Sequence, residues 1–402
     1  MVSQFHEKTI SIQGIILFCI FLATLNTINA YYYFVFIAFG LLVFGTGCRV
    51  NANASFWGLV LLGISYAMFS PYYSNSILGM LKPFSYLFCY MIGYGLNRYE
   101  KFDSNSSLKN FYVVCIFVAT GSFFHYLLNW FINISYMSRN TMDFWTKTVI
   151  NATGQAPLAC LALAFALACL FSDTSKKVKW ISVVVIFLAL GYNLILSGRT
   201  LFVLSLIILV VAFIHKLREQ TGEKGKTILI ALLSVTVILM IYNFNLFSVR
   251  TQIESTPFYE RFFMEDSNAE FHEDSRIEHK IEYITNASSY LFGGTHMREQ
   301  FGYAHDIFLD TYDEAGIFAF FAIAIYILAT LRRMVKCVSN KNLPFEFRQI
   351  ILCIYIILYV QFMLEPIIQG MPWLLASFCV IDGSVSRILS DYNKNFVEET
   401  CY

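Results

Sequence analysis

Residues 302–331 read GYAHDIFLDTYDEAGIFAFFAIAIYILATL, and the two halves of this stretch differ sharply in character. The second half is an apolar run of the kind that crosses the roughly 30 Å hydrocarbon core of a bilayer as a helix. The first half places His305 and four carboxylates directly before that run. Titratable side chains at the mouth of a membrane helix indicate either a helix cap or a reactive site.

Similar apolar runs fill most of the chain outside this stretch. Of its 402 residues, 57% are hydrophobic and only 14% are charged, and the mean hydropathy is +0.59. A soluble globular protein would carry nearer a quarter charged residues. We therefore predict an all-α polytopic membrane protein with about twelve transmembrane helices, because only helices and closed barrels satisfy the backbone in lipid and no barrel pattern occurs. The predicted spans are 10–29, 31–48, 55–70, 76–97, 110–132, 153–171, 180–197, 200–215, 227–246, 313–331, 349–367 and 371–389.

The basic residues predict the orientation of these spans. Most of the 28 lysines and arginines fall in loops on one side if both termini share that side. The positive-inside rule places that side in the cytoplasm. The net charge of +1 gives no reason to expect nucleic acid as a partner.

One connection is much longer than the others. Residues 247–304 are predicted to form an external loop inserted between the ninth and tenth spans of a single membrane domain, 1–402. Loops of this length are usually functional. The spacing of isoleucines predicts a short helix over 274–291, capped by Asp274 and stopped by Gly293 and Gly294.

Three basic residues are candidates for anion binding. Arg199 follows a Ser-Gly turn and opens a membrane helix, where the helix dipole favours an accompanying anion. Arg276 begins the predicted loop helix, and Lys82 lies inside the predicted span 76–97. The plainer alternatives are snorkelling of Arg199 to the interface, a surface salt bridge for Arg276, and outward snorkelling of Lys82.

His305 is the candidate general base, because histidine titrates near 6.5 and can accept a proton at neutral pH. Asp306, Asp310 and Asp313 follow it at helical spacing and form an acidic stripe, with Glu314 beside them. The alternative for these acids is a helix cap favoured by the dipole.

We expect no metal site and no cofactor. His272, His279 and His296 stand near acidic residues but lack a metal-binding spacing such as HExxH. Nucleotide-binding fingerprints are also missing from the sequence.

Four motifs together resemble those of the O-antigen polymerase and ligase superfamily. They are SGRT at 197–200, DSRIEHKIEYITNASSYLFGG at 274–294, HDIFLDTYDEAGIFAFF at 305–321 and EPIIQGMPWLL at 365–375. The family has a histidine followed eleven residues later by a glycine, as His305 and Gly316 are here. Asp306 departs from the asparagine usual at that position, and Phe318-Ala319 replaces a small-residue turn.

The resemblance implies a metal-independent glycosyltransferase of GT-C type in the bacterial inner membrane, with its active site on the periplasmic face. It implies a donor and an acceptor that are undecaprenyl-pyrophosphate-linked glycans. Arg199 and Arg276 would bind the pyrophosphate and His305 would activate the acceptor hydroxyl. We add Lys82 as a third cation, with Asp306, Asp310 and Glu314 as supporting residues.

We interpret the chain as the polymerase of lipid-linked repeat units, with membrane lipids and a chain-length regulator protein as candidate partners. The ligase that transfers the finished glycan to lipid A core is the first alternative, because it uses the same donor. A transporter or flippase for the same lipid is the alternative from another class, with Lys82, Glu365 and Asp382 as its polar positions in the membrane.

Overall fold

The computed structural model is mostly helical and describes residues 2–45, 51–96, 104–134, 139–220 and 275–400, with short pieces between 228 and 259. Seven of its helices are long and apolar enough to cross a membrane. They are Ser107–Ile132, Ala152–Phe171, Lys176–Ile195, Arg199–Glu219, Ile307–Ser339, Phe345–Leu364 and Pro372–Tyr392. The chain is therefore an all-α polytopic membrane protein, as predicted.

The remaining predicted spans have different outcomes. Three coincide with the shorter apolar helices Ile12–Thr24, Tyr31–Gly45 and Ala54–Phe69. The predicted span 76–97 is helical over 77–96, with a 3-10 turn that contains Pro83 between the helices Ile77–Leu81 and Ser85–Leu96. The predicted span 227–246 lies almost entirely outside the described residues, so the total of about twelve stays a prediction.

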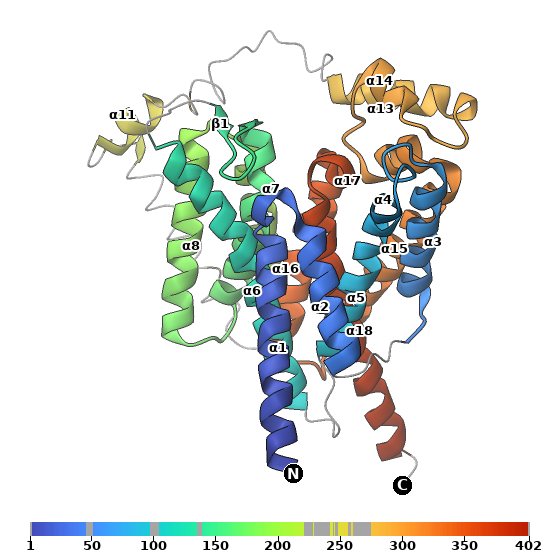
Figure 1. Cartoon of the computed structure of the whole chain (residues 1–402). Helices are drawn as coiled ribbons and strands as arrows, with labels where there is room; N and C mark the ends of the chain where they lie inside the picture. The colour runs from blue at the N-terminus through green and yellow to red at the C-terminus, as the bar shows by residue number, and fades with distance from the viewer. Residues whose placement is uncertain are drawn as a thin grey trace. The chain divides into compact units, whose positions relative to one another are not determined.

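The chain divides into two compact units, and the helices α6 (Ser104–Ile132) and α16 (Phe345–Leu364) contribute residues to both. Figure 1 labels these two helices. The first unit comprises Met1–His125, Asp274–Asn340 and Leu358–Tyr402, and the second comprises Tyr126–Glu273 and Lys341–Ile357. The prediction of one membrane domain over 1–402 is not tested by this division.

The first unit contains most of the helices named in the site below. Its elements are α1 (Val2–Thr24), η1 (Thr27–Asn29), α2 (Tyr31–Gly45), α3 (Ala54–Phe69), α4 (Ile77–Leu81), η2 (Lys82–Phe84), α5 (Ser85–Leu96), α13 (Ser275–Asn286), η5 (Ala287–Ser289), α14 (His296–Phe301), α15 (Ile307–Ser339), α17 (Ile367–Gly370) and α18 (Pro372–Thr400).

Small residues let the helices of the first unit approach closely. Gly93 of α5 and Gly383 of α18 face each other's helix, and a Cβ on either would collide with a backbone carbonyl, of Val380 or of Tyr90. Gly58 of α3 likewise meets the backbone of α15 at Tyr326. Membrane helices depend on such close contacts because lipid provides no hydrophobic drive for their association.

A buried ion pair joins three of these helices. The Arg333 guanidinium of α15 binds the Asp382 carboxylate of α18 and donates to the Ser55 hydroxyl of α3 over 2.9 Å. All three residues are buried. Removing one charge of a buried pair typically costs about 3–5 kcal/mol, so this link holds α3, α15 and α18 in register.

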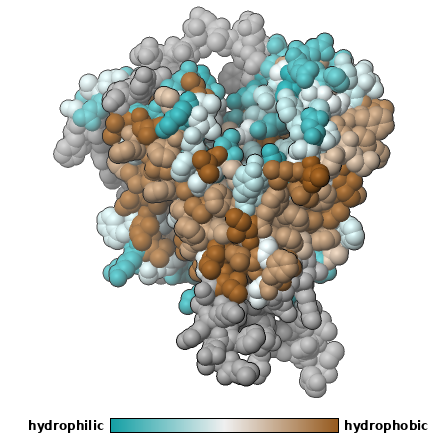
Figure 2. All heavy atoms as spheres, viewed as in Figure 1, coloured by the Kyte–Doolittle hydropathy of each residue, from teal (hydrophilic) through white to brown (hydrophobic). Residues whose placement is uncertain are grey.

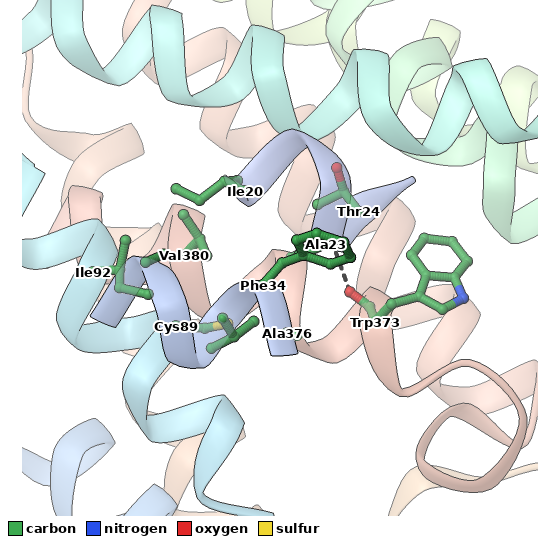
Figure 3. A pocket seen from close by; sticks show the side chains of 12 residues that line it. Ile20, Ala23, Thr24, Phe34, Cys89, Ile92, Trp373, Ala376 and Val380 are labelled. Carbon is green, nitrogen blue, oxygen red and sulfur yellow. Dashed lines mark hydrogen bonds between the residues drawn. The ribbon is translucent and has the colours of Figure 1, made fainter. Parts of the chain in front are cut away.

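Packing in the first unit leaves one small void among α1, α2, α5 and α18. Figure 3 shows Phe34, Cys89, Trp373 and Val380 among the side chains around it. Its volume is about 10 Å³, room for a single water at most. This void is too small and too apolar to be a substrate site.

The second unit is built on α7 (Ala152–Phe171), α8 (Lys176–Ile195) and α9 (Arg199–Glu219), with the short helix α11 (Val249–Glu254). It also contains the one departure from an all-helical fold within the described residues, an antiparallel hairpin of β1 (Asn140–Met142) and β2 (Val149–Asn151). Near the other end of α9, Arg348 of α16 makes two 2.8 Å hydrogen bonds to the Glu219 carboxylate.

The predicted loop 247–304 contains several short helices. The expected helix over 274–291 is α13 followed by the 3-10 turn η5, and Asp274 lies outside the described residues. Hydrophilic side chains dominate the surface over α13 and α14, whereas apolar side chains dominate the surface of the membrane helices (Figure 2). These loop helices, with the broken start of α15, form the candidate site.

Candidate functional site

Two glycine motifs that are distant in sequence lie in direct backbone contact. Gly293 (φ 77°) and Gly316 (φ 75°) both adopt the left-handed conformation that side chains disfavour. A Cβ on Gly293 would lie 2.6 Å from the Gly316 nitrogen, and a Cβ on Gly316 would lie 2.6 Å from the Leu291 carbonyl oxygen. The Ile317 N–H donates to that same carbonyl over 2.9 Å. The loop is thereby fastened to the break in α15.

This break turns the start of α15 back on itself. Ala315 and Gly316 leave helical geometry, and the Phe308 ring lies 6.0 Å from the Phe320 ring. In a continuous helix these residues would be about 18 Å apart along the axis, so residues 307–314 fold back against the following segment. We expected a helix starting near Asp313; instead a helical turn begins at Ile307, and the long helix resumes at Ile317.

The folded-back segment holds His305 in a defined turn. His305 has a φ of 55°, unusual for a residue with a Cβ. One oxygen of the buried Asp310 carboxylate accepts the Ala304 N–H over 3.0 Å, and the other accepts the Asp306 N–H over 3.1 Å. Asp310 therefore binds the backbone on both sides of the histidine, and its two oxygens are occupied by this role.

Asp306 caps the same segment. Its carboxylate accepts the Phe308 N–H over 3.0 Å and lies 3.4 Å from the Lys280 Nζ of α13. Lys280 also donates to the Met363 carbonyl over 3.0 Å. For Asp306 the alternative of a helix cap is thus the one that the geometry favours, and Lys280 ties α13 to the end of α16.

A cavity of about 370 Å³ lies beside this turn in the first unit. Three tyrosines, two cations, one carboxylate, one amide and one aliphatic side chain line it. They are Tyr72, Tyr73, Tyr303, Lys82, Arg298, Glu314, Gln369 and Ile368. Tyr303 connects the cavity lining to His305, because the Tyr303 ring lies 6.5 Å from the His305 ring.

Arg298 dominates the electrostatics of this cavity. Its guanidinium lies 3.0 Å from the buried Glu314 carboxylate and over the Tyr72 and Tyr303 rings, 5.1 and 5.4 Å from their centres. Its Nη2 is buried without a hydrogen-bond partner among the described residues. Glu314 is held in turn by the Ser70 hydroxyl over 2.5 Å. A buried donor with spare capacity is well placed to bind an oxygen-rich ligand.

Lys82 brings a second cation to the same cavity. It begins the 3-10 turn between α4 and α5, and its Nζ lies 4.6 Å from the centre of the Tyr32 ring. With Arg298 and Glu314, Lys82 gives the lining a net charge of +1. The cavity is therefore suited to an anion or to a polar ligand that carries one.

Arg276 lies in the first unit but does not line the cavity. Its guanidinium is 3.6 Å from the buried Glu365 carboxylate, three residues before Ile368 of the cavity wall. Burial raises the pKa of the Glu365 carboxyl to about 7, while the positive charge of Arg276 acts to lower it. Protonation of Glu365 removes the charge–charge attraction between its carboxyl group and the Arg276 guanidinium.

Arg199 belongs to the second unit. As predicted, a tight turn precedes it: Ser197 has a φ of 53°, and the Asn193 side chain donates to the Gly198 carbonyl over 2.6 Å. Arg199 is then the first residue of α9, with an exposed side chain. The grouping of Arg199 with Arg276 and His305 stays a prediction.

Within the described residues, no group of three or more His, Cys, Asp or Glu side chains is arranged to hold a metal ion. His279 points one ring nitrogen at the Tyr303 carbonyl, 3.0 Å away, and the His296 ring lies 5.3 Å from the Tyr290 ring at an interplanar angle of 34°. His272 lies outside the described residues.

Arg298 and the three tyrosines of the cavity were not predicted. Their separation in sequence explains this, since Tyr72 and Arg298 meet only through the fold. One signal was available: REQFGYAH places an arginine and a tyrosine seven and two residues before His305.

The chain was also compared with known proteins. No protein-family model matches it, and no curated protein matches it either.

Proposed function

We propose that the chain is a metal-independent glycosyltransferase that polymerises undecaprenyl-pyrophosphate-linked repeat units at the periplasmic face of the bacterial inner membrane. The observation that carries this proposal is the tyrosine-lined cavity with Arg298 and Lys82, beside the turn of His305. The motif resemblance is the basis for the reaction, and the tyrosines and cations of the cavity support a charged glycan as the ligand.

In the proposed reaction His305 removes the proton from a hydroxyl of the acceptor sugar. The acceptor oxygen then attacks the anomeric carbon of the donor glycan as the bond between that carbon and the pyrophosphate oxygen breaks. Undecaprenyl pyrophosphate leaves with the bonding electrons, and His305 keeps the proton. Direct displacement of this kind inverts the anomeric centre.

Cations assist this step by stabilising the charge that develops on the leaving oxygen. At a separation of about 4 Å and an effective dielectric near 20, one charge pair contributes about 4 kcal/mol. Such a contact speeds transfer only if it tightens in the transition state. Arg276 and Arg199 have this role by resemblance, and Lys82 is the third cation proposed from the sequence. Arg298 is added here because it shares the cavity with Lys82.

The tyrosines have a separate role in the proposal. Tyr72 and Tyr303 present amphipathic rings to the cavity, with flat faces for sugar rings and hydroxyls for hydrogen bonds. Gln369 adds an amide, and its Nε2 also donates to the Asp310 backbone carbonyl over 2.9 Å. The saccharide of the acceptor would therefore lie against the same element that positions His305.

Ligation to lipid A core is the alternative that shares the donor, and the described residues do not separate the two reactions. The transporter alternative loses one of its polar positions, because Asp382 is bound to Arg333 in a buried structural link. Lys82 and Glu365 lie with the candidate site.

The test is a gel of surface glycolipids from cells that lack this gene, rescued by wild type, His305→Ala or His296→Ala. His296 is the matched control, since it is an exposed histidine of the same loop. We expect core with a single repeat unit in the null strain, a full ladder with wild type and His296→Ala, and no ladder with His305→Ala.

Other outcomes decide against parts of the proposal. Bare core with accumulated lipid-linked polymer in the null strain would indicate a ligase. A normal ladder from stably expressed His305→Ala would show that the histidine is not the base.

A further inference from the structure

The surface of α13 is divided into three sectors. One sector touches the rest of the first unit through Tyr283, which is buried and donates to the Gly302 carbonyl over 2.8 Å, and through Arg276 and Lys280. A second sector is acidic and exposed, with Glu278 and Glu282. The third sector consists of Ile277, Ile281 and Ile284, which are 56%, 58% and 66% exposed.

The three isoleucines form one continuous stripe, because positions spaced by four and three lie on the same helix face. A large aliphatic side chain left in water loses about 1.5–3 kcal/mol relative to burial, so three together on a twelve-residue helix indicate a surface with an apolar neighbour.

A second exposed apolar surface begins at Phe292, a few residues after α13 ends, and includes residues of the membrane helices. Phe292, 59% exposed, stacks on Phe69 of α3 at 5.5 Å and lies 6.5 Å from Phe318 of α15. From Phe318 an exposed apolar row follows one face of the α15 span through Phe321, Ile325 and Leu328. That row faces lipid, because it lies on a membrane span and is uncovered by the described residues.

We propose that α13 is an interfacial helix whose isoleucine stripe inserts into the bilayer that the chain spans, at the boundary between headgroups and acyl chains. The occupant is lipid because the chain leads from α13 through η5 to Phe292, which lies 6.5 Å from Phe318 at the start of the exposed row on the α15 span. The sectors fit this position: apolar side chains enter the membrane, acidic side chains face water, and the remaining sector binds the protein.

This placement puts Arg276 and Lys280 at the level of the lipid headgroups, since both flank the stripe on the protein side. The inference does not depend on the proposed function. If the proposed function holds, the same depth brings Arg276 to where a lipid-linked pyrophosphate lies.

The test uses the full-length protein in proteoliposomes and a tryptophan placed on each exposed sector. Ile281→Trp reports on the apolar stripe, and Glu282→Trp, on the adjacent acidic sector, is the matched control. The emission of wild type, with its 5 native tryptophans, is subtracted. The quenchers are phospholipids brominated on the acyl chains and aqueous iodide.

We expect the indole of Ile281→Trp to lose emission to brominated lipid and to be shielded from iodide, and the indole of Glu282→Trp to show the reverse. Quenching of both indoles by iodide alone would overturn the proposal. The Ile281→Trp indole could instead be shielded from both quenchers and lose this shielding when the protein is diluted in lipid. That result would assign the stripe to a contact with a second copy and would also overturn the proposal. Glycan polymerisation is not part of this readout.

Discussion

Among single residues, Asp310 most clearly links structure to the proposed chemistry. The sequence placed it in an acidic stripe, where it could have been a supporting residue of the site or a cap. Its two oxygens instead accept the N–H groups on either side of His305. It is a positioning residue, because it acts through the turn that it holds.

Asp310→Asn should therefore slow glycan transfer without weakening substrate binding. An amide has one acceptor oxygen, so one of the two N–H groups loses its partner, at about 1–3 kcal/mol. We expect kcat to fall with KM nearly unchanged in a polymerisation assay with purified protein. Asp306→Asn is the control, because asparagine caps a helix as well as aspartate does, and it should keep activity. Wild-type kcat from Asp310→Asn would contradict the role.

Glu365 should make stability depend on pH. Its folded pKa of about 7 exceeds the ordinary 4.5, so the native state holds a proton that the unfolded state releases between these values. The free energy of unfolding then falls as pH rises through this window, by on the order of 3 kcal/mol. We expect Tm measured in detergent to fall from pH 5 to 8 in wild type and to fall less in Glu365→Gln. Parallel Tm curves for the two proteins would refute this assignment.

At the scale of elements, the break in α15 depends on its contact with the loop. Gly316→Ala would strain a left-handed residue, at about 1–3 kcal/mol, and would push a Cβ against the Leu291 carbonyl. We expect a clear drop in Tm. Gly191→Ala in α8 is the control, because a Cβ there meets nothing within 4 Å, and it should leave Tm unchanged or raise it slightly. Equal Tm values for the two variants would show that the glycine contact does not hold the loop.

Elements were predictable where one physical signal decides them. Within the described residues, seven long helices match runs of apolar residues. These were predictable because a helix that crosses the hydrocarbon core needs only sufficient length and an apolar composition. The 3-10 turn at Lys82 was missed although Pro83 signals it, since apolar residues continue on both sides. The fold-back before Ile317 depends on contacts of Gly316 with Leu291, and no local pattern encodes a contact between two loops.

For the whole molecule, the sequence predicts which loops face outward. Introduced cysteines test this, because the cysteines of the described residues are all buried. We expect a membrane-impermeant maleimide to label Glu282→Cys in intact spheroplasts and to label Lys177→Cys only after permeabilisation, since both positions are exposed but lie in loops predicted on opposite sides. Wild type sets the background. Labelling of both positions from outside would contradict the predicted topology.

In the candidate site, too, residues that are close in sequence could be predicted, and residues brought together by the fold could not. His305, Asp306 and Asp310 could be predicted as a group because they are close in sequence. The cavity joins Tyr72, Lys82, Arg298 and Gln369 from four separate segments, which only the folded chain brings together. Arg298 was missed for this reason, although it pairs with the buried Glu314 and lies over the Tyr72 ring.

The central claim is that this chain joins lipid-linked repeat units, and the most direct measurement is reconstitution. Purified protein in proteoliposomes is given undecaprenyl-pyrophosphate-linked repeat unit as the only substrate, and products are resolved by gel and mass. We predict a ladder that grows by whole repeat units, with release of undecaprenyl pyrophosphate. His305→Ala should abolish this ladder, and His296→Ala should keep it. Unchanged substrate with folded wild-type protein, or an equal ladder from His305→Ala, would contradict it.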